Sequence, residues 1–170
     1  MQTKQTLLAR LDAIARSLEA SGHAEVLIGL GSVGLELDRL DEYSDLDFFA
    51  IVEEDWKAHY IDNLAWLEQV APVAYAFRNT VDGYKLLFAD GIFCEFAVFE
   101  RAELARIPFA PGRVVWKRPD VPESIAIPQA AADAPAEKST EHLLGEALTN
   151  LYVGLCRYRR GERLSALRFI

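Results

Sequence analysis

The stretch that decides the fold is GLGSVGLELDRLDEYSDLDF, residues 29–48. A short apolar segment that ends in glycines, residues 25–30, leads into it, and the β-favouring run FFAIV, residues 48–52, closes it. Both segments are predicted to be buried strands. Asp45 and Asp47 stand two positions apart at the start of the second strand, so both carboxylates are expected to project from one face of the sheet.

The glycine turn between these strands has the composition of a phosphate-binding loop. The first strand delivers the chain to Gly31 and Ser32, and a helix is predicted to begin just after them. Backbone N–H groups and the Ser32 hydroxyl would then face a polyphosphate, whose charge the helix N-terminus favours. Asp45 and Asp47 supply the hard oxygen ligands that Mg²⁺ prefers, with phosphate oxygens and water in the remaining positions. Metal ions held in this way align an attacking hydroxyl with the α-phosphorus and neutralise the leaving pyrophosphate.

A second interpretation of the same glycines is the dinucleotide-binding fingerprint. Gly29-x-Gly31-x-x-Gly34 follows a predicted strand, and Glu53 or Glu54 lies about 20 residues further on, where a ribose-binding carboxylate is expected. The context disfavours it, because only ten residues, mostly charged or turn-forming, separate the last glycine from the aspartates. A crossover helix normally buries an apolar stripe against its sheet. The fingerprint also leaves the two aspartates without a role.

The pattern Gly31-Ser32, twelve residues, then Asp-Leu-Asp-Phe at 45–48 resembles the signature of the polymerase-beta-like nucleotidyltransferase superfamily. Its flanking segment DEYSDLD, residues 41–47, is similar in particular to bacterial antibiotic nucleotidyltransferases that act on aminoglycosides and lincosamides. The resemblance covers residues 24–100 and continues weakly into residues 150–163. It implies transfer of a nucleoside monophosphate, usually AMP from ATP, to a hydroxyl group with the assistance of Mg²⁺.

The family also carries a third carboxylate on a later strand, and Glu95 is the candidate. It lies in the predicted strand 92–99, where a buried carboxylate is costly unless a cation or a hydrogen bond compensates it. The resemblance implies that Glu95 is either a further metal ligand or the general base that takes the proton of the acceptor hydroxyl. The alternative from the residues alone is an edge-strand glutamate that faces water.

The rest of the chain predicts an α/β (α+β) fold, with a small mixed sheet, helices packed on it and further helices at the C-terminus. We divide it into a catalytic domain at 1–121, a proline- and alanine-rich linker at 122–139 and a helical segment at 140–170. The apolar, uncapped end indicates either a longer helical domain or a covering partner chain. The predicted elements are a helix over 7–18 that stops at Ser21-Gly22, a helix over 60–70, a hairpin of strands 84–88 and 92–99 around Asp90-Gly91, and a helical segment over 140–170 that is interrupted near Gly161.

Charge and composition narrow the function classes. The chain of 170 residues carries 18 basic and 26 acidic side chains, a net charge of −8, which argues against nucleic-acid binding. Residues 151–170 are basic, so the acidic excess lies in the rest of the chain. No apolar run approaches the roughly 20 residues of a membrane span, and no signal peptide is recognised, so we expect no membrane partner and a cytoplasmic location. Two cysteines cannot form a disulfide framework.

Two groups of basic residues lie outside the motif. Lys85, in the predicted hairpin, could reach a phosphate, but a solvated lysine is the preferred interpretation. The arginines between positions 157 and 168 are expected on a solvated helix face, although they could also lie against the acidic half of the chain.

The sequence therefore predicts a Mg²⁺-dependent nucleotidyltransferase that uses a nucleoside triphosphate and a small, cationic, hydroxylated acceptor such as a lincosamide or an aminoglycoside. Gly31 and Ser32 would hold phosphates, and Asp45, Asp47 and Glu95 would form the catalytic, metal-binding carboxylate set. One alternative keeps the chemistry and modifies a protein partner, as in toxin–antitoxin pairs. Another is a non-catalytic module that binds nucleotide or dimerises, and homodimerisation stays open.

Overall fold

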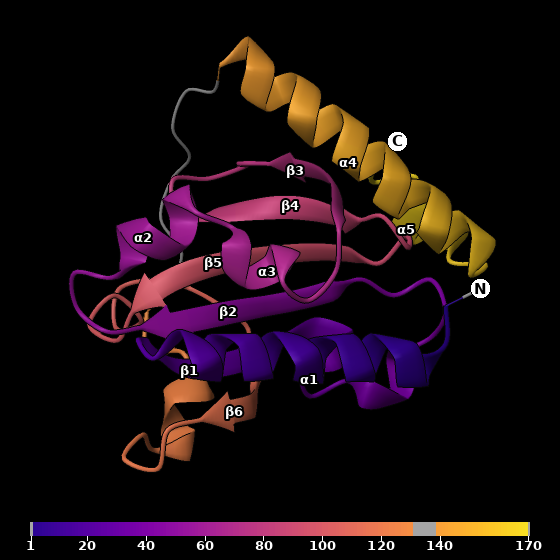
Figure 1. Cartoon of the computed structure of the whole chain (residues 1–170). Coiled ribbons are helices and arrows are strands. Elements are labelled where there is room, and N and C mark those ends of the chain that lie inside the picture. The colour runs from indigo at the N-terminus through magenta and orange to yellow at the C-terminus, as the bar shows by residue number, and fades with distance from the viewer. Residues whose placement is uncertain (1, 131–138, 170) are drawn as a thin grey trace.

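The core of the fold is one six-stranded mixed sheet in the strand order β3-β4-β5-β2-β1-β6 (Figure 1). The structure, a computed structural model, describes residues 2–130 and 139–169. The predicted fold class, a mixed sheet with helices packed on it, is confirmed. The strands are β1 Ala24–Gly29, β2 Leu46–Val52, β3 Val73–Phe77, β4 Gly83–Phe88, β5 Phe93–Glu100 and β6 Arg113–Lys117.

Helix α1, Lys4–Ser21, covers one face of the sheet. Its buried residues recur at helical spacing and pack on the alternate residues of β1, β2, β4 and β5 that point to the same side. A capping box of Thr3 and Thr6 begins the helix, and Gly22, with a φ of 82°, ends it in the left-handed conformation. The predicted first helix and its stop are therefore confirmed.

The segment expected to form one helix over 60–70 forms two short ones, α2 Lys57–Asp62 and α3 Ala65–Glu68. Asn63 interrupts them in an extended conformation, and its side-chain oxygen accepts a hydrogen bond of 3.0 Å from the backbone N–H of Ala65. A short amide side chain competes in this way with the hydrogen bonds of a continuous helix. Both helices pack beside α1 on the first face of the sheet.

Strand directions decide between the two interpretations of the glycine turn. β1 and β2 are antiparallel neighbours, paired from Ala24 opposite Val52 to Gly29 opposite Phe48. A dinucleotide-binding unit needs parallel strands joined by a crossover helix. The fingerprint interpretation, with Glu53 or Glu54 as the ribose ligand, is therefore wrong.

The remaining pairings make the sheet mixed. β4 and β5 form the predicted antiparallel hairpin, and β5 runs parallel to β2 on its other side. The two edge strands, β3 and β6, had no clear signal in the sequence. β6 pairs antiparallel with β1 and β3 with β4.

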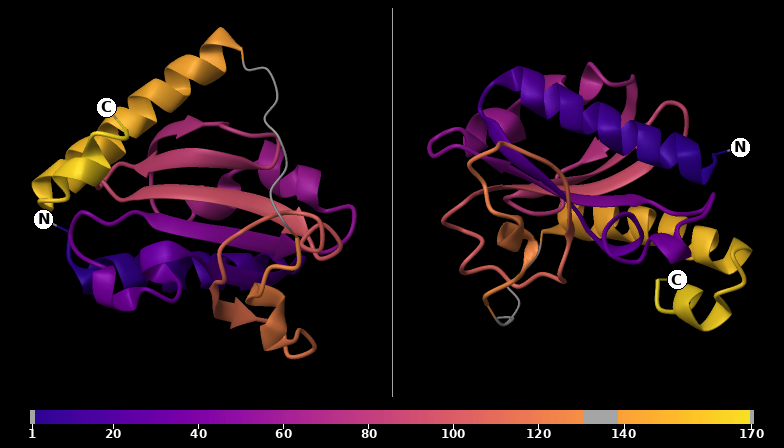
Figure 2. Two further views of the ribbon diagram at one scale, coloured as in Figure 1. Left: turned by 180° about the vertical axis from the view of Figure 1, so that it is seen from behind. Right: turned by 90° about the horizontal axis from the view of Figure 1, so that it is seen from below.

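Helix α4, Thr140–Arg159, lies over the second face of the sheet, opposite α1 (Figure 2). Gly145 of α4 packs against the ring of Phe77 at the end of β3. The chain turns at Gly161 and continues into the short helix α5, Arg163–Ala166, as the predicted interruption requires. In the described ranges, no helix combines the length and apolar character needed to cross a bilayer.

Residues 122–130 of the predicted linker follow the sheet closely. A 3-10 turn, Glu123–Ala126, buries Ala126 in the smaller apolar cluster on the second face. Residues 131–138 of that linker lie outside the described residues. The division into a catalytic domain, a linker and a helical segment stays a prediction.

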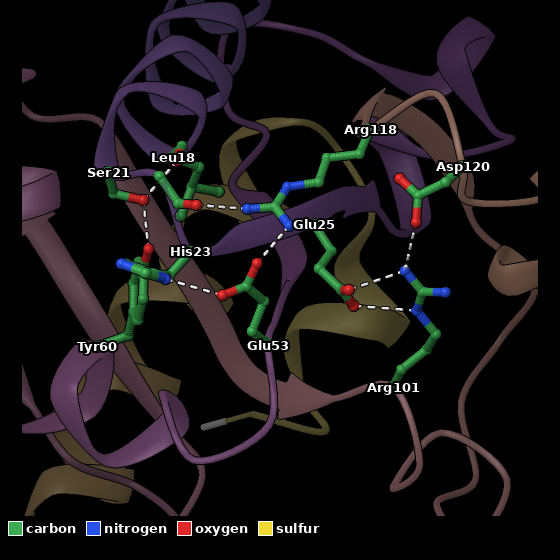
Figure 3. A network of polar contacts seen from close by, with 10 residues as sticks. Leu18, Ser21, His23, Glu25, Glu53, Tyr60, Arg101, Arg118 and Asp120 are labelled. Atoms are coloured by element: carbon green, nitrogen blue, oxygen red, sulfur yellow. Dashed lines mark hydrogen bonds and ion pairs between the residues drawn. The ribbon is translucent and has the colours of Figure 1, made fainter.

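A polar network fastens the end of β2 that lies away from the aspartates (Figure 3). Glu53 shares a hydrogen bond of 2.8 Å with Nδ1 of His23 and forms an ion pair with Arg118. Arg118 also donates a hydrogen bond to the carbonyl oxygen of Gly22, where α1 ends. The network ties the end of α1, the end of β2 and the segment after β6 to one another.

Candidate active site

The turn after β1 is tighter than the sequence predicts. Gly31–Val33 forms a single 3-10 turn, and the helix expected just after Ser32 is absent from this part of the described chain. Gly34 explains the difference, because any Cβ there would lie 2.7 Å from the carbonyl oxygen of Gly29. The chain therefore folds back on β1 and does not rise into a helix. A single turn offers backbone N–H groups but lacks the macrodipole of a long helix.

Asp45 and Asp47 lie directly beside this turn. Asp45 precedes the first residue of β2, and Asp47 is its second residue, so both side chains point to the second face of the sheet. The backbone N–H of Leu30 donates a hydrogen bond of 2.8 Å to the carbonyl oxygen of Asp47. A Cβ on Gly31 would lie 3.4 Å from Oδ2 of Asp47. The predicted phosphate-binding residues and the paired aspartates are therefore adjacent.

Glu95 stands next to Asp47 on the neighbouring strand. The parallel register of β2 and β5 aligns Asp47 with Glu95, and strands in a sheet lie about 4.8 Å apart. β5 is an interior strand, between β4 and β2, so the edge-strand alternative for Glu95 is wrong. The side chain is 44% exposed and accepts a hydrogen bond of 3.0 Å from Nδ2 of Asn79.

The three carboxylates perturb one another. Burial raises the pKa of Asp47 well above its ordinary value, and the charges of Asp45 and Glu95 raise it further. Burial also raises the pKa of Asp45 and of Glu95, although the charge of Lys85 partly opposes the increase at Glu95. Closely spaced carboxylates resist simultaneous ionisation unless a cation joins them. The raised pKa values mark this place as one where a bound cation would be strongly favoured.

The aspartates have the chemistry that a divalent cation requires. Among the described side chains, none forms an ion pair or a hydrogen bond with the carboxylate of Asp45 or Asp47. These oxygens are the hard ligands that Mg²⁺ prefers, and two of them leave room for phosphate oxygens and water. No group of three or more His, Cys, Asp or Glu side chains within 2–130 and 139–169 is arranged to hold a metal ion. Asp45 and Asp47 offer two ligands for one ion, and the metal-binding role of Glu95 stays a prediction.

A small cavity of about 110 Å³ opens in front of the aspartates. Its first wall is the turn of Gly31 and Ser32 together with Asp45 and Asp47. The opposite wall is the C-terminal half of α4, which contributes the side chains of Tyr152, Val153, Cys156, Arg157 and Arg160. A larger groove of about 540 Å³ lies on the other side of Asp47 and is lined by residues that include Phe49, Asn79, Glu95 and Phe99. Gly31 and Asp47 line both spaces.

Arg160 holds the loop that precedes the aspartates. Its guanidinium pairs with both carboxylate oxygens of Asp41, at 2.6 and 2.8 Å, and donates a hydrogen bond of 3.0 Å to Oγ of Ser44. Burial alone would raise the pKa of Asp41, but the hydrogen bond from Arg160 and those from Tyr43 and Ser44 lower it overall. The position of Asp45 thus depends on the docking of α4.

The arginines of the C-terminal segment divide between the two expected locations. Arg157 and Arg160 face the acidic half of the chain and line the cavity, whereas Arg159, Arg163 and Arg168 are exposed. Arg157 donates a hydrogen bond of 2.7 Å to Oγ of Ser165 in α5. A solvated helix face was the preferred prediction for all of these arginines, and for Arg157 and Arg160 the alternative, a location against the acidic half, is the one found. Their spacing of three positions, which places both on one helix face, was the available signal.

Lys85 is a basic residue whose preferred location, in solvent, is wrong. It was predicted to be solvated, yet it is 5% exposed and lies under α4. The antiparallel pairing of β4 with β5 places Lys85 directly opposite Glu95. Asn79, also buried, keeps its Oδ1 atom without a hydrogen-bond partner in the described part of the chain. Lys85 and Asn79 therefore face the two carboxylate oxygens of Glu95.

Comparisons with known proteins give partial structural similarity alone. No protein-family model matches the sequence, and no curated protein matches it. A structure of Cid1, which has RNA terminal uridylyl transferase activity, aligns with 53% of this chain and 29% of Cid1, at 22% identity and a TM-score of 0.40. The CD-NTase CdnG of Bradyrhizobium diazoefficiens, in complex with GTP, aligns with 66% of this chain and 40% of CdnG, at 18% identity and a TM-score of 0.30. The chain thus spans less than half of either protein, and we take its function from its own residues.

Proposed function

We propose that this chain is a Mg²⁺-dependent nucleotidyltransferase that moves a nucleoside monophosphate, AMP from ATP, to a hydroxyl group of a small cationic acceptor. Asp45 and Asp47 would bind the metal ion with the triphosphate. Gly31 and Ser32 would contact phosphate oxygens through backbone N–H groups and the hydroxyl. Glu95 would take the proton of the acceptor hydroxyl.

The observation that carries the proposal is the alignment of Asp47 with Glu95 across β2 and β5, beside the turn of Gly31 and Ser32. It supports a reaction centre with a phosphate-binding turn on one side and a proton acceptor on the other. Arg157 adds positive charge on the opposite wall of the small cavity, where Arg160 is already paired with Asp41. Guanidinium groups suit triphosphate oxygens, because they donate several hydrogen bonds in a fixed plane.

The two spaces beside Asp47 suit the two substrates. The triphosphate would enter the small cavity, between the glycine turn and α4, with its α-phosphorus toward Asp47, and the nucleoside would extend out of this cavity. The acceptor would lie in the groove, with its hydroxyl toward Glu95. Glu95 would take the hydroxyl proton, the acceptor oxygen would bond to the α-phosphorus, and the bond from that phosphorus to the bridging oxygen would break to release pyrophosphate. When bound, Mg²⁺ supplies positive charge to the reacting phosphate groups.

The lining and volume of the groove also favour a small, cationic acceptor. Its walls are mainly apolar and aromatic, and its charged lining residues are Asp47, Asp82 and Glu95. Asp82 pairs with Lys57 and Glu95 faces Lys85, which leaves Asp47 as the carboxylate without a paired cation among the described side chains. Such a surface, as the described residues form it, offers no cation to a phosphodiester backbone and would attract an amine. Lincosamides and aminoglycosides combine these features, in keeping with the motif resemblance.

The decisive experiment incubates the chain with Mg²⁺, ATP and a panel of lincosamides and aminoglycosides. The expected result is one antibiotic whose mass increases by one AMP, with an equal amount of pyrophosphate released. Asp45→Asn is the matched inactive variant. Release of pyrophosphate with an adduct on a protein would transfer the acceptor role to a protein partner. Binding of ATP with no turnover on any acceptor would leave a nucleotide-binding module and contradict the proposed reaction.

A further inference from the structure

Lys85 is a buried cation in the middle of the candidate active site. Its residue is 5% exposed, and its ammonium group lies between the sheet and α4. Nζ is 3.2 Å from Oε1 of Glu146 and 3.3 Å from Oδ1 of Asn150, both on α4, and 3.9 Å from Oε2 of Glu95 on β5. A lysine is rarely buried to this degree unless it is paired. Here one ammonium faces two carboxylates and one amide oxygen.

The same contacts account for the surroundings of Glu95. One oxygen of its carboxylate accepts the hydrogen bond from Asn79, and the other faces Lys85. Asp45 and Asp47, by contrast, have no cationic group within ion-pair distance among the described side chains, although the charges of Lys85 and Arg157 partly oppose the rise of both pKa values. The described residues contain no three-membered metal-ligating group that would join Glu95 to the aspartates. The carboxylates therefore divide into a pair open to a metal ion and a third that already has a cation.

We infer that Lys85 takes, beside Glu95, the place that a second divalent cation would otherwise occupy. The site then binds one divalent ion, on Asp45 and Asp47, and Glu95 stays free of metal as the proton acceptor. Lys85 acts through Glu95, so it is a positioning residue. The inference rests on the proposed function. It specifies how many divalent ions the site binds and which residue accepts the proton.

Helix α4 takes part in this arrangement because it supplies two of the three partners of Lys85. Glu146 and Asn150 are four positions apart, on one face of the helix, and both reach the ammonium group. Removal of Lys85 leaves Glu95 and Glu146 as neighbouring carboxylates without a cation between them. Glu95, which lies opposite Asp47 in the parallel register of β2 and β5, would then form with that aspartate a carboxylate set that attracts a further divalent ion, whether or not Glu146 is charged.

The test counts bound Mn²⁺ on the full chain by electron paramagnetic resonance, with the nonreactive analogue α,β-methylene-ATP present in excess. Wild type is expected to bind one Mn²⁺ per chain in its nucleotide complex, and Lys85→Met two. Lys85→Arg keeps the cation and should bind one. Because Lys85→Met leaves two carboxylates unpaired, the double variant Lys85→Met/Glu146→Gln guards against loss of the fold and is also expected to bind two. Circular dichroism confirms that each variant folds.

Two Mn²⁺ on wild type, or one on both Lys85→Met and the double variant, would overturn the role of Lys85. The same titration reports analogue binding separately, and its absence would contradict the proposed function. If the analogue does not bind, a titration with Mn²⁺ alone still tests the role of Lys85. The double variant should then bind Mn²⁺ at least about tenfold more tightly than wild type. Equal affinities would reject the inference. A structural lysine would affect stability but not the number of bound ions.

Discussion

Gly145 of α4 lies so close to Phe77 of β3 that a Cβ at position 145 would be 2.0 Å from the Cζ atom of the ring. No real side chain tolerates such a contact, so this glycine sets the distance between α4 and the sheet. That distance matters because α4 carries one wall of the candidate nucleotide cavity.

We expect Gly145→Ala to lower the melting temperature and the rate of transfer together. Overpacking costs about 1–3 kcal/mol, because three atoms of the Phe77 ring within 2.3 Å of the new Cβ must move away from it. The cost should exceed the gain of about 1 kcal/mol that alanine brings to a helix. Thermal unfolding by circular dichroism measures the change. The double variant with Phe77→Leu should recover part of the loss, and an increase in stability of the single variant would contradict the packing described.

We expect Arg157→Met to raise the KM for ATP by about 10- to 100-fold, because a hydrogen bond to a charged group contributes about 1.5–3 kcal/mol. Arg157 lines the cavity, whereas Arg159, two positions further along α4, is exposed. Arg159→Met is therefore the matched control and should leave KM unchanged. Steady-state kinetics with varied ATP distinguishes the two variants. Equal effects would show that Arg157 has no specific contact with the triphosphate.

The sequence predicted the elements whose signals are local. The amphipathic helix, the strands around the glycine turn and the Asp90-Gly91 hairpin are all specified by periodicity and turn residues within a few positions. The adjacency of Asp47 and Glu95 agrees with the motif, and the register of β2 and β5 supplies its physical cause.

The missed features depend on contacts between distant segments. β3 and β6 are edge strands whose pairing partners stabilise them, and no residue within either strand has a distinctive signal. The burial of Lys85 depends on Glu146 and Asn150, more than 60 positions further along the chain. The absent helix after Ser32 depends on the close approach of Gly34 to the carbonyl of Gly29, which the spacing of glycines indicated only in part.

Asp47→Asn should abolish transfer and stabilise the metal-free protein. Burial and the charges of Asp45 and Glu95 raise the pKa of Asp47 in the folded chain, so the folded state holds this proton more tightly than the unfolded state does. Stability is therefore highest below the unfolded value of about 4 and falls as pH rises through the folded pKa. The asparagine side chain has no proton to lose, so the variant keeps its stability as pH rises. We expect its melting temperature at pH 8 to be about 2–4 °C higher than that of wild type, the change that ~1 kcal/mol produces in a chain of this size.

The pH dependence of the stability of Asp47→Asn provides a control within the same experiment. The difference in melting temperature between wild type and Asp47→Asn should shrink as pH falls toward 4, where the wild-type carboxyl is protonated in both states. Transfer should fall by orders of magnitude at every pH. A variant that is equally active, or that is destabilised at pH 8 and unaffected by pH, would remove Asp47 from the metal-binding pair.

Arg160→Met should destabilise the chain at neutral pH and have little effect in acid. The folded pKa of Asp41 is lowered, so its contribution to stability is present above the unfolded value of about 3.9 and is lost as pH falls through the folded pKa. Melting curves from pH 7 to pH 2 on wild type and the variant measure this. We expect a difference of about 2–4 °C at pH 7 that vanishes at the acid end. A difference independent of pH would assign the effect to packing and not to the ion pair.

The contacts of α4 also affect the order in which the candidate site is assembled during synthesis. Lys85 meets Glu146 across 61 positions of the chain, and Asp41 meets Arg160 across 119. Contacts of such long sequence separation form late, after local hairpins and helices. The sheet and the three carboxylates leave the ribosome well before residue 160, so a nascent chain carries the candidate catalytic groups before the second wall of the small cavity has formed. Nucleotide affinity is thus expected to arise only after Arg160 has been translated.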